Sequence, residues 1–279
     1  MEWNVVMTNN KKLHICEEGQ GEKTVILVHG LTGNHKQMAY YQEALGEHYR
    51  VISYDLRGRG LSDEASEPTS IDHHVGDLVD LIMRLDLETV TLIGYSIGAY
   101  ICAKVTALSS RVTSLVLLDG AGVADLGQKE LILPSLERLR KTYQSKDDYI
   151  RQTKQTYEKL QIKWTNHLED LAHYETKETN EGVVHRSKVS VMEQDFNSFF
   201  DYKHEEILPN IDIPVLLVKA TGYLGPHRPL FFNESFTELE KSIRKIDVMI
   251  TGADHLSLVF EKQKDVLLSV ERFLQRATV

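Results

Sequence analysis

The sequence lacks the features that stabilise small secreted domains and those that mark membrane proteins. Among 279 residues it has two cysteines, Cys16 and Cys102, and two cysteines far apart do not make a disulfide framework. We expect both to be reduced, buried thiols. No apolar run reaches the roughly 18 residues that a membrane span needs, and the first residues lack the basic and apolar regions of a signal peptide. These absences predict a cytoplasmic protein that does not enter a membrane.

Positive charge and metal-binding motifs are also missing. The net charge is −9, which repels phosphate backbones, so nucleic acid is not an expected partner. The chain has no C-x-x-C, no H-E-x-x-H and no G-x-G-x-x-G after its first strand. We therefore expect no metal and no cofactor, and a small molecule as the binding partner. The sequence leaves open whether copies of the chain form a homo-oligomer.

Short continuous apolar runs alternate with segments of helical spacing. The runs lie at residues 25–28, 51–54, 90–93, 115–118, 215–218 and 248–250. The helical segments lie at residues 36–46, 71–85, 97–108, 235–241 and 257–276. A continuous apolar run indicates a strand covered on both faces, and the alternation predicts an α/β fold with a mostly parallel, doubly wound sheet. Residues 3–7 and 11–16, separated by Asn9-Asn10, predict an additional hairpin.

One long stretch interrupts this alternation. From about residue 123 to 208 the sequence has no clear buried strand and carries charged, helix-forming runs. We predict a core of residues 1–122 and 209–279 and a helical cap insertion of residues 123–208. A tethered independent domain is less favoured, because the stretch is too small and too charged for a large core of its own.

A pentapeptide, Gly94-Tyr95-Ser96-Ile97-Gly98, stands between a predicted strand and a predicted helix. The G-x-S-x-G pattern in this context is typical of a nucleophilic serine. The glycines allow a turn so tight that larger side chains would collide with neighbouring strands. The helix N-terminus supplies positive potential where an oxyanion forms. The pattern predicts Ser96 as a nucleophile, the alternative being a structural serine at a helix N-cap.

Together with His29-Gly30 after the first buried strand and His255 after the last, this pentapeptide resembles the α/β-hydrolase superfamily. The resemblance covers nearly the whole chain and implies the α/β-hydrolase fold. It implies an oxyanion hole made by the backbone N–H groups of Leu31 and Ile97, with His29 as a structural residue. It places the general base at His255, because a neutral imidazole can take the serine proton and return it.

Other basic residues have alternative interpretations. Residues 55–63 resemble the family's D-x-R-G-x-G-x-S loop, which implies a structural role for Arg57 and Arg59. A clamp for an anionic substrate is the alternative. His73-His74 and His227 fall in predicted loops, where we expect exposed polar surface.

The acid of a catalytic triad departs from the family's pattern. Tyr223 stands near the place where many relatives carry this acid. Asp119 is favoured, because it ends the strand after the nucleophile strand and preserves the order Ser, acid, His. Glu234 is the second candidate. Asp125, Asp254 or a water-assisted dyad remain as further alternatives.

Taken together, these residues predict a serine hydrolase that cleaves a carboxylic ester or lactone of a small, largely apolar substrate through an acyl-enzyme. A carbon–carbon bond hydrolase of the meta-cleavage kind and a non-catalytic small-molecule receptor on the same scaffold are the alternatives. Five aromatic residues of the predicted cap could line an acyl pocket, although their spacing favours a packing core: Trp164, Phe196, Phe199, Phe200 and Tyr202.

Overall fold

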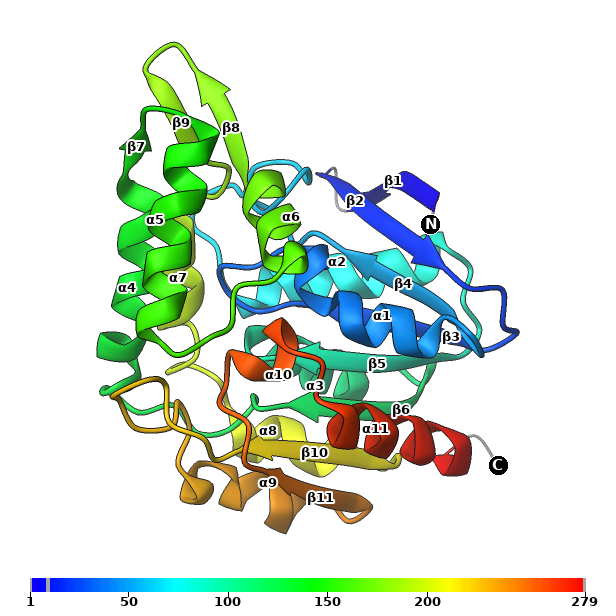
Figure 1. Cartoon of the computed structure of the whole chain (residues 1–279). Coiled ribbons are helices and arrows are strands. Elements are labelled where there is room, and N and C mark those ends of the chain that lie inside the picture. Colours follow the sequence, from blue (N-terminus) through cyan, green and yellow to red (C-terminus); the bar gives the residue numbers. More distant parts are fainter. Residues whose placement is uncertain (1, 9–10, 278–279) are drawn as a thin grey trace.

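An eight-stranded sheet organises the chain, in a computed structural model that describes residues 2–8 and 11–277 (Figure 1). The strand order is β1-β2-β4-β3-β5-β6-β10-β11. The strands are β1 (Glu2–Thr8), β2 (Lys11–Glu18), β3 (Thr24–Val28), β4 (Arg50–Tyr54), β5 (Val90–Tyr95), β6 (Val112–Leu118), β10 (Val215–Ala220) and β11 (Ile246–Thr251). β1 and β2 form an antiparallel hairpin, β2 pairs antiparallel with β4, and the remaining neighbours are parallel. The predicted mostly parallel sheet is therefore confirmed, while the predicted turn at Asn9-Asn10 lies outside the described residues.

Burial along the strands follows the apolar runs with one exception. Every residue of β3, β5 and β10 is buried. β11 was expected to be covered on both faces, yet Val248 is 41% exposed and Ile250 is 63% exposed. The expectation was wrong here because β11 is the edge strand of the sheet, where less of the fold covers its side chains.

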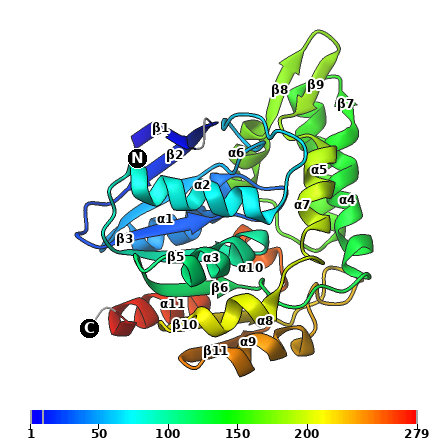
Figure 2. The same ribbon diagram turned by 180° about the vertical axis from the view of Figure 1, so that it is seen from behind.

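Helices cover both faces of the sheet. They are α1 (Ala39–Leu45) after a 3₁₀ turn η1 (His35–Met38), α2 (Ile71–Arg84), α3 (Ile97–Leu108), α9 (Thr237–Ser242) after η3 (Asn233–Phe236), α10 (Ser257–Phe260) and α11 (Lys264–Ala277). Helices α1 and α11 lie in front of the sheet in Figure 1, and α2 and α3 lie in front of it in Figure 2. The single helix predicted at 257–276 is two helices, because Glu261 has extended backbone angles (φ −127°, ψ 149°).

Between β6 and β10, which pair directly, the chain makes a long excursion. It contains α4 (Gln128–Arg140), β7 (Thr142–Tyr143), α5 (Lys146–Lys159), α6 (Asn166–Tyr174), β8 (Thr176–Thr179), β9 (Gly182–His185), α7 (Val189–Asn197), α8 (His204–Ile207) and η2 (Leu208–Asn210). Helices α4 to α7 lie beyond the carboxyl ends of the central strands, whereas α8 lies against the sheet beside α3 (Figure 2). We call residues 123–208 the insertion; its role as a cap and its limits stay predictions.

A small second sheet inside the insertion was not expected. Its strands pair antiparallel in the order β7-β9-β8. These strands are two to four residues long, and half or more of each strand's residues are not fully buried, so no continuous apolar run marks them in the sequence. Within the described residues, no helix has the length and apolar character to cross a membrane.

Candidate active site

Ser96 occupies a strained turn between β5 and α3. Its backbone angles are φ 56° and ψ −120°, which non-glycine residues rarely adopt. A Cβ atom on Gly94 would lie 2.2 Å from the carbonyl oxygen of Gly98, and one on Gly98 would lie 2.2 Å from that of Val28. Neighbouring backbone therefore comes too close to Gly94 and Gly98 for any residue with a Cβ atom. The turn presents Ser96, which is 7% exposed, to a pocket at the carboxyl edge of the sheet.

Asp119 directly follows β6, the neighbour of β5, and contacts His255. The His255 Nδ1 and Asp119 Oδ2 atoms are 2.7 Å apart, and Asp119 is fully buried. The second carboxylate oxygen accepts a hydrogen bond from the Ala220 N–H at 3.0 Å. An ionised carboxylate only accepts hydrogen bonds, so Nδ1 carries the proton and Nε2 of His255 keeps its lone pair. This is the tautomer that a general base requires.

The position of His255 is fixed from two further sides. The ring of Tyr95 stacks on the His255 ring with centroids 4.8 Å apart, and the Tyr95 hydroxyl donates to the His255 carbonyl oxygen at 2.8 Å. Asp254 Oδ1 accepts from the N–H groups of Leu256 and Ser257, which caps the short helix α10. The imidazole is thereby held by its backbone, its face and its Nδ1 atom.

The other acid candidates have different surroundings. Glu234 is exposed in η3, and Asp125 pairs with Arg228 at 2.6 Å. Asp254 is used by the helix cap described above. Tyr223, at the position where many relatives carry an acid, is 69% exposed. Of the carboxylates considered, the structure brings Asp119 to His255.

Hydrogen bonds of His29 hold the loop that follows β3. His29 is fully buried, and its Nε2 accepts from the Leu56 N–H at 3.0 Å. The proton is therefore on Nδ1, which donates to the Gly30 carbonyl oxygen at 2.7 Å. Burial lowers the pKa of His29 to about 3, so the ring is neutral. Both ring nitrogens of His29 hold backbone groups, as expected for a structural residue.

Two backbone N–H groups near Ser96 are left free to donate. The Gly30 N–H is occupied, since it donates to Gln37 Oε1 at 2.8 Å. By contrast, the N–H groups of Leu31 and Ile97 have no hydrogen-bond acceptor among the described residues. These are the two groups expected to form the oxyanion hole.

A pocket joins these groups to apolar side chains of the core and of the insertion. Ser96 and His255 both line it. Its apolar lining includes Leu31, Leu131, Ile132, Leu160, Phe196, Phe199, Leu224, Leu230, Phe231 and Leu256, and its polar lining includes Thr32, Gln37, Gln128, Ser135 and His227. None of the lining residues found in the described chain is Lys, Arg, Asp or Glu. The pocket thus offers hydrogen bonds and apolar surface but no fixed charge.

Sequence reasoning missed part of this lining and misplaced two histidines. Phe196 and Phe199 pack together, with ring centroids 5.2 Å apart, and also line the pocket. Gln37 and Gln128 carry no motif, and their contribution is visible only once the chain is folded. His73 and His74 were expected in an exposed loop, but both belong to α2. His73 is exposed there, whereas His74 is fully buried and contacts a carboxylate of the insertion.

Neither Arg57 nor Arg59 lines the pocket. Arg57 pairs with Asp77, and Arg59 Nη2 lies 2.7 Å from Asp195 Oδ2. Both pairs are buried inside the protein, as expected for structural residues. Within the described ranges, no cluster of three or more His, Cys, Asp and Glu side chains could hold a metal ion.

The alpha/beta hydrolase fold family matches residues 23–222, so the chain belongs to this family. A curated relative, the (E)-2-((N-methylformamido)methylene)succinate hydrolase of Acinetobacter baylyi, is 29% identical over 136 residues, which cover 48% of this chain and 51% of that protein. The chain spans about half the length, or less, of the curated relatives it matches.

Solved structures with the same fold cover nearly the whole chain. E-2-(acetamidomethylene)succinate hydrolase has a TM-score of 0.85 at 17% identity, covering 98% of this chain and 99% of the other. The enol-lactonase from Burkholderia xenovorans has a TM-score of 0.71 at 19% identity, covering 98% and 100%. These likenesses confirm the predicted fold. The family match and the curated relative named as a hydrolase support an α/β-hydrolase enzyme.

Proposed function

We propose that this protein is a serine hydrolase that cleaves a carboxylic ester or lactone through an acyl-enzyme. The observation that carries the proposal is the hydrogen bond between Asp119 and His255, in a pocket that both His255 and the strained Ser96 line. In this arrangement Ser96 is the nucleophile, His255 the general base and Asp119 the acid that orients it.

The chemistry follows from the proton positions. Nε2 of His255 takes the proton of Ser96 Oγ as that oxygen attacks the carbonyl carbon. The negative charge that develops on the carbonyl oxygen accepts hydrogen bonds from the Leu31 and Ile97 N–H groups. His255 then gives its proton to the leaving alkoxide, which departs as an alcohol. Water then attacks the acyl-enzyme as it gives a proton to His255. His255 passes that proton to Ser96 Oγ when the acyl–oxygen bond breaks, which releases the carboxylic acid and restores the free enzyme.

The lining of the pocket favours a neutral acyl group. A succinate derivative, such as those in the names of two similar proteins, carries carboxylates. A pocket without lysine or arginine in its lining offers no fixed positive charge to pair with them. The insertion, through Leu131, Phe196 and Phe199, would serve as the cap that shapes an apolar acyl pocket.

A labelling experiment tests the nucleophile directly. We expect a fluorophosphonate to modify Ser96, located by peptide mass spectrometry, and p-nitrophenyl esters to be hydrolysed. Ser96→Ala should lose the label and reduce kcat by about 10⁴-fold or more. Ser190→Ala, which changes an exposed serine on α7, is the matched control and should keep both.

A substrate panel tests the acyl group and the alternatives. Neutral short and medium acyl esters and lactones should be cleaved faster than monoesters of succinate. Preference for vinylogous diketones would favour a carbon–carbon bond hydrolase instead. An unlabelled Ser96 together with no turnover on any substrate would contradict the hydrolase proposal and favour a ligand-binding protein.

A further inference from the structure

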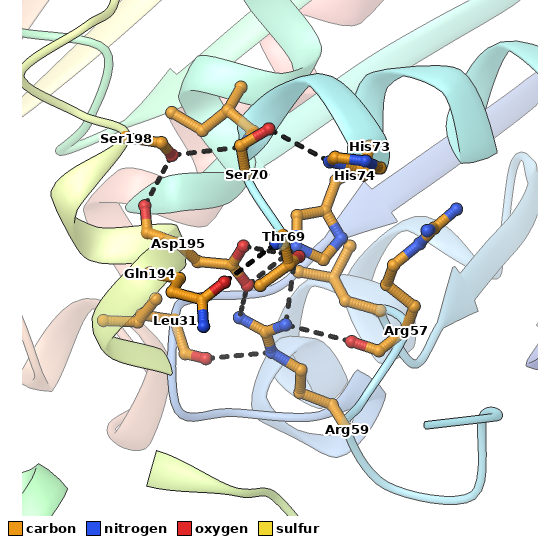
Figure 3. Close-up of polar contacts among 12 residues, drawn as sticks. Leu31, Arg57, Arg59, Thr69, Ser70, His73, His74, Gln194, Asp195 and Ser198 are labelled. Carbon is orange, nitrogen blue, oxygen red and sulfur yellow. Dashed lines mark hydrogen bonds and ion pairs between the residues drawn. The ribbon is translucent and has the colours of Figure 1, made fainter. Parts of the chain in front are cut away.

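Arg59 is fully buried and every polar atom of its guanidinium has a partner (Figure 3). Its Nη2 pairs with Asp195 Oδ2 at 2.7 Å, and its Nη1 donates to the Arg57 carbonyl oxygen at 2.9 Å. Its Nε donates to the carbonyl oxygen of Leu31 at 3.2 Å. One side chain of the 55–63 loop therefore contacts the insertion at one end and the proposed oxyanion loop at the other.

Asp195, on α7, is the anchor on the side of the insertion. It is fully buried, and its Oδ2 also accepts from His74 Nε2 at 2.9 Å. Its Oδ1 accepts from the Thr69 hydroxyl at 2.9 Å. Burial opposes the ionisation of Asp195, but the charge of Arg59 and the contact with His74 outweigh it and lower its pKa. The carboxylate stays charged and satisfied inside the protein.

Two residues near Asp195, one on α7 and one directly after its end, extend the same junction. Gln194 Oε1 accepts from the Thr69 N–H at 3.0 Å, and Ser198 Oγ accepts from the Ile71 N–H at 3.0 Å. Figure 3 shows these contacts in a row between α7 and the segment that leads into α2. The end of α7 is thus fixed to the core by specific hydrogen bonds.

The two peptide groups that flank Leu31 are held by different side chains. His29 Nδ1 donates to the Gly30 carbonyl oxygen, which belongs to the same peptide group as the Leu31 N–H. Arg59 Nε donates to the Leu31 carbonyl oxygen, on the following peptide group. Fixing both planes fixes the backbone angles of Leu31, and hence the direction of its N–H. Only the second of the two restraints depends on the insertion.

A buried ion pair is a poor source of stability, because the cost of removing two charges from water can exceed their attraction. An apolar pair would join α7 to the core as well. The charged pair differs because it also fixes the orientation of the Arg59 side chain, since the N–H groups of a planar guanidinium donate in defined directions.

We propose that Arg59 and Asp195 are positioning residues, which couple the packing of α7 against the core to the orientation of the Leu31 N–H. When α7 is packed against the core, Asp195 holds the guanidinium of Arg59 with its Nε aimed at the Leu31 carbonyl oxygen. When Asp195 is absent or neutral, the guanidinium is free to turn, and the oxyanion loop loses one of its two restraints. The proposal rests on the proposed function, because it assigns the Leu31 N–H to the oxyanion hole.

The test compares two buried carboxylates of the insertion with matched surroundings. Asp195 contacts Arg59 and His74, and Glu175 contacts Arg138 and His185. We expect Asp195→Asn to lower kcat on p-nitrophenyl acetate by about 10-fold or more, within the limit of about 10²–10³-fold for losing an oxyanion donor. KM should stay close to that of the wild type. Glu175→Gln should lower the melting temperature without lowering kcat.

Hydrogen–deuterium exchange supplies a readout that needs no activity. The Gly30 N–H donates to Gln37 Oε1 in η1, and the Gly33 N–H donates to the Gly30 carbonyl oxygen. Their exchange should accelerate in Asp195→Asn but not in Glu175→Gln. Arg59→Lys is the second variant, for the case that Asp195→Asn does not fold. It keeps the positive charge but lacks the Nε donor, so exchange of the Gly30 and Gly33 N–H groups should accelerate in it as well.

The outcomes separate the two proposals. Equal effects of Asp195→Asn and Glu175→Gln on kcat, or unchanged loop exchange in both Asp195→Asn and Arg59→Lys, would overturn the coupling. Absence of Ser96 labelling and of turnover in the wild type would overturn the proposed function, while the exchange comparison would still decide whether Asp195 restrains the loop.

Discussion

Two side chains at the site project from backbone in the left-handed region. Ser96 has φ 56° and Asp119 has φ 43°, and they follow the adjacent strands β5 and β6. Such conformations cost of order 1–3 kcal/mol each and persist where the surroundings determine them. Here the Ser96 N–H donates to the Leu118 carbonyl oxygen and the Asp119 N–H to that of Val218. The sheet therefore holds both side chains at its edge.

The first prediction concerns Asp119. In Asp119→Asn the amide oxygen can still accept from the Ala220 N–H, which turns the NH₂ group toward His255 Nδ1. An NH₂ group favours the tautomer with the proton on Nε2, which cannot act as a base. We expect kcat to fall by about 10³–10⁴-fold with little change in KM.

The matched control for that substitution is Glu234→Gln, at the exposed carboxylate that competed with Asp119 on sequence grounds. Its steady-state rate on the same ester should equal that of the wild type. If Glu234→Gln fell further than Asp119→Asn, the assignment of the acid would be wrong.

Among single residues, the sequence predicts Ser96 as the nucleophile and His255 as the base, because each stands in a motif beside a strand. It leaves the acid open, because which carboxylate reaches His255 depends on strand order. β10 lies between β6 and β11, and its Ala220 N–H orients the carboxylate of Asp119. Nothing local to Asp119 carries that information, and the same is true of the contact between Arg59 and Asp195.

Among the elements, the strands and helices of the core were predicted one by one, whereas the insertion was predicted as helical and its small sheet was missed. Buried strands and amphipathic helices leave periodic patterns in the sequence. The strands β7, β8 and β9 are too short to leave one, and a buried polar cluster takes the place of a large apolar core. In that cluster Arg138 contacts Glu175, and the Tyr149 hydroxyl donates to Glu175 Oε1 at 2.6 Å.

The second prediction is a pH dependence of stability that originates in this cluster. Burial opposes the ionisation of Glu175, but the charge of Arg138 and the contacts with His185 and Tyr149 outweigh it and lower its pKa to about 2. A lowered pKa contributes stability above the unfolded-state pKa, about 4.3 for Glu. That stability is lost as the pH falls from this value toward 2.

Glu175→Gln removes this titration. We expect the variant to be less stable than the wild type by about 3–5 kcal/mol at pH 7, because Arg138 is left without its charged partner. The difference should narrow as the pH falls from about 5 to about 3. Urea unfolding across that range measures it. The control Glu178→Gln removes an exposed partner of Lys146 and should cost at most about 1 kcal/mol at any pH. A difference that widened in acid would contradict the assignment.

For the whole molecule, the pocket is a joint product of the core and the insertion. The core contributes Ser96, His255 and the loop around Leu31, and the insertion contributes Leu131 and Phe196. Composition and motifs predict the class of chemistry, since they concern the core. They do not predict the substrate, because that depends on how α4 and α7 sit over the strand ends.

The last prediction tests whether α4 limits the acyl chain. Leu131 lines the pocket, whereas Leu133 on the same helix is 38% exposed and does not line it. Leu131→Ala opens space beside the acyl group, and each additional buried methylene contributes about 0.8 kcal/mol, or roughly fourfold in kcat/KM. The ratio of kcat/KM for octanoyl to acetyl p-nitrophenyl esters should therefore rise in Leu131→Ala. It should stay at the wild-type value in Leu133→Ala. A ratio that moved equally in both variants would mean that α4 acts through stability of the insertion and not through the shape of the pocket.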